Sequence, residues 1–243
     1  MIEIGRRAFL GGGAGTLALA LAGCNTTPAP EAEIDAAIPR RGKKGVTVVA
    51  DETTLTGAES YQALYGPVSG ERFAVPGLRK GVISQEFWRR DVAYASPEAA
   101  GTIIVDPRRH YLYHVRGDGS ARRYGVGVGR QGFAWSGVAE IRSKQEWPDW
   151  YPPKEMIERQ PELKRSVAQL QSGLGMAGGP RNPLGARAMY LWQGNKDTLF
   201  RIHGTTEPSS IGHSASSGCI RMVNQDAIDL YSNVAVGTRV VVI

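Results

Sequence analysis

From residue 101 onward the hydrophobic positions follow a period close to two, which predicts short β-strands. Glycine, aspartate and proline separate the runs and mark the turns between them. The predicted strands are residues 102–105, 111–115, 121–128, 138–142, 188–192, 199–203 and 238–243. We therefore expect a mainly β fold, either a sandwich or a barrel.

Two stretches depart from this period and predict helices. Residues 153–170 form a helical insertion in which Pro153 opens the first turn. Residues 225–234 form a second helix, for which Asn224 is the expected N-cap. The catalytic or binding unit that contains these elements is expected to span residues 101–243.

The chain before residue 101 is divided by composition. Residues 46–100 are interpreted as an extension packed on the main domain, with a strand at 46–50 and a short helix at 84–90. Residues 24–45 are rich in proline, threonine and alanine, which is typical of a tether.

Residues 1–23 are interpreted as an export signal. Arg6-Arg7 precedes a short stretch rich in glycine, alanine and leucine, and this arrangement resembles a twin-arginine signal. Leu21-Ala22-Gly23-Cys24 resembles a lipobox, whose cysteine becomes lipidated. An ordinary secretory signal and plain signal cleavage are the alternatives. The resemblance implies a membrane-anchored lipoprotein of the periplasm or cell envelope.

The chain has two cysteines, and acylation of Cys24 would leave Cys219 as the remaining thiol. No intramolecular disulfide is then expected. A buried core cysteine is the alternative interpretation of Cys219.

The clearest candidate for a catalytic pair is His203 with Cys219. The cysteine lies sixteen residues after the histidine and directly follows Ser216-Ser217-Gly218. A thiol of ordinary pKa, about 8.5, is only slightly ionised at neutral pH, so a nearby base would activate it. Gly218 lets a substrate carbonyl approach, and backbone N–H groups at Gly218 and Cys219 are candidates for an oxyanion hole. The pattern favours acyl transfer.

Alternation along 199–203 places His203 and Arg201 opposite Phe200 and Ile202, so His203 is expected to face a cleft and act as the base. His213 is a rival base. The four histidines lack metal-ligand spacing, and neither a metal nor an organic cofactor is expected.

This pattern resembles the YkuD-type L,D-transpeptidase catalytic domain, in which His-Gly is followed by Ser/Thr-His-Gly-Cys, an apolar residue and arginine. The residues that match this signature are His203, Gly204, Ser216, Gly218, Cys219, Ile220, Arg221 and Asn224. Ser217 stands where many members carry a second histidine, which leaves activation of the thiol to His203.

The resemblance implies a β-sandwich or barrel with a helical insertion and a helix after the nucleophile. It also implies a peptidoglycan transpeptidase that passes an acyl group from a stem tetrapeptide through Cys219 to an amine, and acylation of this cysteine by carbapenems. The alternatives are an L,D-carboxypeptidase or hydrolase with the same site, an enzyme that attaches proteins to peptidoglycan, and a noncatalytic wall-binding lipoprotein.

The residues around this pair have predicted supporting roles. Ser216 and Ser217 support the loop or the oxyanion hole, while Gly204 and Asn224 bind substrate. Arg221 either pairs with a substrate carboxylate or braces the loop through backbone carbonyls. The net charge is +6 with scattered basic residues, so nucleic acid is not an expected partner, and we expect a monomer.

Overall fold

The computed structural model describes residues 60–129, 136–216 and 218–243. The predicted export signal, Cys24, the tether, the strand at 46–50 and Ser217 lie outside the described residues. The domain boundaries drawn from the sequence therefore remain predictions.

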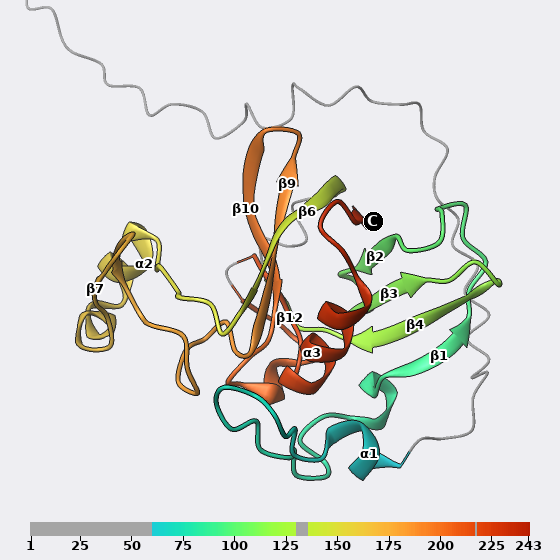
Figure 1. Ribbon diagram of the computed structural model, residues 1–243, viewed down its shortest axis with the longest axis horizontal. Helices are drawn as coiled ribbons and strands as arrows, with labels where there is room; N and C mark the ends of the chain where they lie inside the picture. Colours follow the sequence, from blue (N-terminus) through green and yellow to red (C-terminus); the bar gives the residue numbers. More distant parts are fainter. Residues whose placement is uncertain (1–59, 130–135, 217) are drawn as a thin grey trace, which may run out of the picture. The chain divides into compact units, whose positions relative to one another are not determined.

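A mixed sheet dominates the described part of the chain (Figure 1). Its strands, in spatial order, are β1 (Arg90–Ala93), β4 (Ser120–Gly125), β3 (Tyr111–Val115), β2 (Ile103–Asp106), β13 (Arg239–Val242), β6 (Gly137–Glu146), β9 (Arg187–Gln193), β10 (Lys196–His203) and β12 (Ile220–Arg221). Neighbours pair in antiparallel fashion except for β13 with β2 and β10 with β12, which are parallel. The expected mainly β fold is confirmed.

Two small ladders and three α-helices complete the described part of the chain. The ladders pair β5 (Val128–Gly129) with β11 (Ser214–Ser216), and β7 (Ala168–Leu170) with β8 (Gly173–Gly175). The helices are α1 (Tyr61–Tyr65), α2 (Lys154–Arg159) and α3 (Asn224–Asn233). Short 3₁₀ turns lie at Gln85–Phe87, Pro161–Arg165 and Pro208–Ser210. In the described part of the chain, every helix is too short or too polar to span a bilayer.

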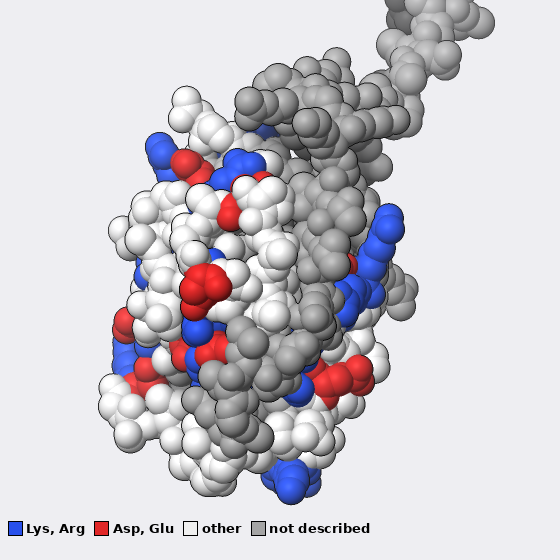
Figure 2. All heavy atoms as spheres, turned by 90° about the vertical axis from the view of Figure 1, so that its right-hand side faces the viewer, with Lys and Arg blue, Asp and Glu red and all other residues white. Residues whose placement is uncertain are grey.

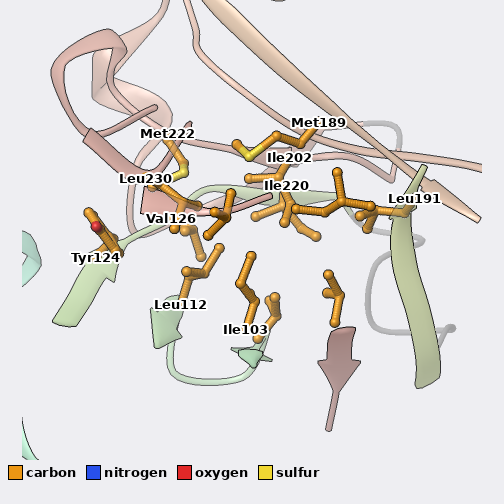
Figure 3. Packing of buried hydrophobic residues seen from close by; sticks show 14 of the residues in the cluster. Ile103, Leu112, Tyr124, Val126, Met189, Leu191, Ile202, Ile220, Met222 and Leu230 are labelled. Atoms are coloured by element: carbon orange, nitrogen blue, oxygen red, sulfur yellow. The ribbon is translucent and has the colours of Figure 1, made fainter. Parts of the chain in front are cut away.

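The core forms because the curved sheet brings its two halves face to face (Figure 3). Ile103 and Leu112 from β2 and β3 point toward Leu191 and Ile202 from β9 and β10, and all four side chains are fully buried. Such packing of two inner faces is the arrangement of a sandwich. It fixes β10, the strand that carries His203, against the centre of the molecule.

The upstream segment contributes its own apolar contacts to the domain. Leu64 and Tyr65 of α1 pack with Ile211 and with Val223, the residue before α3. Farther along, Val75 packs against Trp147 and Ala186. Residues 60–88 therefore lie against the loops and the helix that surround β10 and β12.

Some predicted elements differ from the observed ones. The strand expected at 121–128 is divided into β4 and β5, because Gly127 pairs with Arg221 instead of continuing the β3–β4 ladder. The helix expected at 84–90 is a 3₁₀ turn followed by β1, and the insertion at 153–170 contains α2, a 3₁₀ turn and β7.

Candidate functional site

The candidate site lies where β10 and β12 run side by side. In this parallel pair Ile202 is opposite Ile220, and His203 is opposite Arg221. Both isoleucines are buried in the core, so alternation directs His203 and Arg221 to the other face of the strands, and Cys219 directly precedes β12. The spacing of strands and residues places the Cα atoms of Cys219 and His203 about 8 Å apart. The roles of the two residues as nucleophile and base remain predictions.

The imidazole of His203 is buried, with 4% of the residue exposed. Its Nδ1 donates a hydrogen bond to the Gly204 carbonyl at 2.5 Å. Burial lowers the pKa of His203 to about 4, and the positive charges of Arg221 and Arg201 add to this shift, while the bond to Gly204 opposes it. Near neutral pH the ring is therefore uncharged, and a proton on Nδ1 leaves the lone pair on Nε2.

The thiol of Cys219 is partly buried and donates a hydrogen bond from Sγ to the Leu199 carbonyl at 3.9 Å. Burial raises the pKa of Cys219 above its ordinary value, although the backbone N–H and the charge of Arg201 act in the opposite direction. A thiol with a raised pKa is protonated at neutral pH. At neutral pH the Cys219 thiol and the His203 imidazole are accordingly both uncharged.

A bulge in β10 presents the Leu199 carbonyl to the sulfur. Asp197 is opposite Trp192 and Arg201 is opposite Tyr190, so three residues of β10 stand against one residue of β9. Leu199 adopts a φ of 61°, a conformation that costs free energy in a residue with a branched side chain. Because a bulge bends the strand that carries it, we assign the bend of β10 next to Cys219 to these residues.

Ionic contacts brace the bulge. The Asp197 carboxylate accepts the N–H of Leu199 at 2.9 Å and two guanidinium bonds from Arg201 at 2.7 and 2.8 Å. The bulge at Asp197 and Leu199 cannot be predicted from the sequence, because alternation alone gives no sign of where a strand bulges.

Gly218 has a φ of 131°, which a residue with a side chain rarely adopts. A Cβ atom at this position would also lie 3.0 Å from the Phe200 ring. Ser216 belongs to β11 and pairs with Gly129. The predicted oxyanion and supporting roles of Gly218, Ser216 and Ser217 remain predictions.

Arg221 makes an ion pair with Glu207 at 2.9 Å. The guanidinium thus contacts a carboxylate, while the main chain of Arg221 pairs with Gly127. Bracing of the loop by the Arg221 guanidinium through backbone carbonyls remains a prediction. Glu207 is exposed, and fourteen residues separate the two partners without a recognisable pattern. A role for Arg221 in binding a substrate carboxylate remains a prediction.

Asn224 is not the N-cap of the second helix, because α3 begins at Asn224 itself and Val223 precedes it. Its side-chain oxygen instead accepts the backbone N–H of Ala186 at 2.9 Å. This bond turns the amide away from the helix end and toward β9. Substrate binding by Asn224 and Gly204 remains a prediction.

Replacing Gly204 by alanine is expected to destabilise the fold, because a Cβ at this position would lie 2.2 Å from the Asn224 side-chain oxygen. Overpacking of this kind costs about 1–3 kcal/mol in the free energy of unfolding, measured by urea denaturation. Gly117→Ala is the matched control, since its new Cβ makes an ordinary contact at 3.5 Å. Equal stability of the two variants would contradict the expectation.

The rival base, His213, lies beside His110. Its charge contributes to lowering the pKa of His110, for which burial is the larger cause, and His110 contacts the Ser214 hydroxyl at 3.2 Å. Within residues 60–129, 136–216 and 218–243, no group of three histidine, cysteine or acidic side chains is arranged to hold a metal ion.

The chain was compared with known proteins. The sequence model of the YkuD family, the L,D-transpeptidase catalytic domain, matches residues 100–242. The probable L,D-transpeptidase ErfK/SrfK of Escherichia coli K12 is 34% identical over 148 residues, covering 58% of this chain and 43% of the relative. The protein of that name from Salmonella typhimurium LT2 is 27% identical over 211 residues, covering 82% of this chain and 63% of the relative.

A crystal structure from Brucella melitensis, described as a probable carnitine operon oxidoreductase, is 52% identical. The match covers 66% of this chain and 96% of the Brucella chain, with a TM-score of 0.45. The matched segments span less than two thirds of the Escherichia and Salmonella relatives. The family model matches more than half of the residues of this chain. The chain therefore belongs to the family of L,D-transpeptidase catalytic domains.

Proposed function

We propose that this protein is a peptidoglycan L,D-transpeptidase in which Cys219 forms the acyl-enzyme and His203 moves the protons. Family membership supports the class of reaction. The observation that carries the assignment of roles is the bond from His203 Nδ1 to the Gly204 carbonyl, which leaves Nε2 as the basic nitrogen, on a strand paired with the one that directly follows Cys219.

In the first step His203 Nε2 takes the proton of the Cys219 thiol as the sulfur attacks the L-centre carbonyl of a stem tetrapeptide. The C–N bond to the terminal D-residue breaks, and the imidazolium returns the proton to the departing amine. A thioester to Cys219 remains. Backbone N–H groups at Gly218 and Cys219 are the proposed donors to the oxyanion.

In the second step an amine of a neighbouring stem attacks the thioester carbonyl, and His203 removes the proton of the attacking nitrogen. The C–S bond breaks, the sulfur regains a proton from the imidazolium, and an amide cross-link forms. The reaction requires no metal or organic cofactor, since every group that it needs is a side chain, a backbone N–H or a substrate.

The setting of this chemistry is part of the proposal. The Arg6-Arg7 signal and the lipobox that ends at Cys24 support a lipoprotein anchored to a membrane of the cell envelope and facing the periplasm. We place the protein there as a monomer. On the face shown in Figure 2, acidic and basic side chains are interspersed.

Incubation with purified tetrapeptide muropeptides, followed by mass spectrometry of the products, tests the proposed reaction. A transpeptidase gives cross-linked dimers that have lost one terminal D-residue. Tripeptides without dimers would indicate a hydrolase, and unchanged muropeptides would contradict the enzymatic assignment. The Cys219→Ala variant controls for a contaminating activity.

A further inference from the structure

Glu71 lies outside the segment that the family model matches, and its carboxylate binds two side chains of the matched domain. It accepts two bonds from the Arg187 guanidinium, at 2.8 and 2.6 Å, and one from the Trp147 indole at 2.9 Å. The Arg187 and Glu71 side chains are 7% and 12% exposed. The bonds to Arg187 lower the pKa of Glu71, and the bond to Trp147 adds to this shift, while burial opposes it.

The partners of Glu71 are joined to the backbone beside His203. The Arg187 carbonyl accepts the N–H of Gly204 at 2.9 Å, and the Gly204 carbonyl in turn accepts the Nδ1–H of His203. The Arg187 guanidinium also binds the carbonyl of Ala186. A continuous series of contacts thus runs from Glu71 through Arg187 and Gly204 to the imidazole.

Ala186 holds this series in place from the other side. Its carbonyl accepts the N–H of Trp147 at 2.8 Å, while its own N–H binds the side chain of Asn224. Since Gly204 packs directly on Ala186, a shift of the backbone at 186–187 would move the Gly204 carbonyl. That carbonyl fixes the tautomer and the orientation of His203.

We propose that Glu71 is a positioning residue for His203, so that the functional unit of this chain includes the upstream segment as well as the matched domain. This inference rests on the proposed function, because it assigns Glu71 to the general base of that reaction. Without the carboxylate, the Trp147 indole and the Arg187 guanidinium would lose the bonds that Glu71 accepts, and the backbone that orients the imidazole would lose this support.

A double-mutant cycle between Glu71 and His203 tests the proposal, with the rate of Cys219 acylation by a saturating carbapenem as the readout on the full chain. We expect Glu71→Ala to lower this rate about tenfold, and to change it less than about twofold in a His203→Gln background. The concentration of drug at half-saturation should change little in either background.

Glu98→Ala is the matched control, because Glu98 forms a similar carboxylate–arginine pair with Arg239 at 2.9 Å on β13. It should leave acylation unchanged. If Glu71→Ala does not fold, Glu71→Gln retains an acceptor and is expected to give a smaller loss with the same dependence on His203.

A purely structural role would lower thermal stability while leaving the acylation rate of the folded protein unchanged, and this result would overturn the proposal. An equal loss of rate with and without His203 would overturn it as well. If the wild type is not acylated, or if His203→Gln has no effect, the proposed function itself fails instead.

Discussion

Replacing Cys219 by serine is expected to abolish acylation of the protein by meropenem and formation of cross-linked muropeptides. A serine hydroxyl is far less acidic than a thiol, and the His203 imidazole is a weak base whose pKa burial lowers to about 4. Removing a nucleophile from a site whose residues act together typically lowers the rate by a factor on the order of 10³ or more.

Intact-mass spectrometry after brief exposure to meropenem measures this effect. Cys24→Ser is the matched control, since it removes the other cysteine of the chain by the same chemical change. The control should gain the drug mass as fast as the wild type does. Labelling that persists in Cys219→Ser and disappears in Cys24→Ser would refute the assignment of the nucleophile.

The second large effect is expected for His203→Gln. In the proposed mechanism an uncharged imidazole takes the thiol proton during attack, so the acylation rate of the wild type should be constant between about pH 5 and pH 8. Below this range the rate should fall as the imidazole, with its pKa of about 4, becomes protonated. In the variant only the thiolate reacts, and the rate should rise about tenfold per pH unit.

At pH 7 we expect the acylation rate of His203→Gln to be about 10²–10³-fold lower than that of the wild type, because burial raises the pKa of Cys219 and leaves little thiolate. His213→Gln is the control, since it makes the same change at the rival base, which lies beside His110. A flat pH profile in His203→Gln, combined with a steep one in His213→Gln, would transfer the role of base to His213.

Local pattern predicted the strands that are regular and missed the irregular ones. Residues 111–115 were expected as a strand and form β3 over the same range, because Leu112 packs in one core cluster while Tyr111, Tyr113 and Val115 pack in the other. The two-residue strand β12 is too short for a period to appear. The bulge in β10 was missed for another reason. Asp197 and Arg201 stabilise it, but charged residues of this kind also occur at exposed positions of regular strands and so do not mark a bulge.

The candidate pair was predictable and its surroundings were not. His203 and Cys219 are identified by a motif of local spacing, whereas Glu71 and Arg187 are 116 residues apart and meet only in the folded chain. Asn224 shows the same limit. Its N-cap propensity favoured a local bond, but the backbone N–H of Ala186 is the partner that the folded chain supplies.

The contact between Cys219 and the Leu199 carbonyl has a consequence for the lifetime of the protein. Peroxides and disulfides react with thiolates far faster than with thiols, and a sulfur that keeps its proton is correspondingly slow to form sulfenic acid or mixed disulfides. Because burial raises the pKa of Cys219 and its Sγ–H donates to the Leu199 carbonyl, we expect oxidation of this thiol by peroxide to be slow at neutral pH.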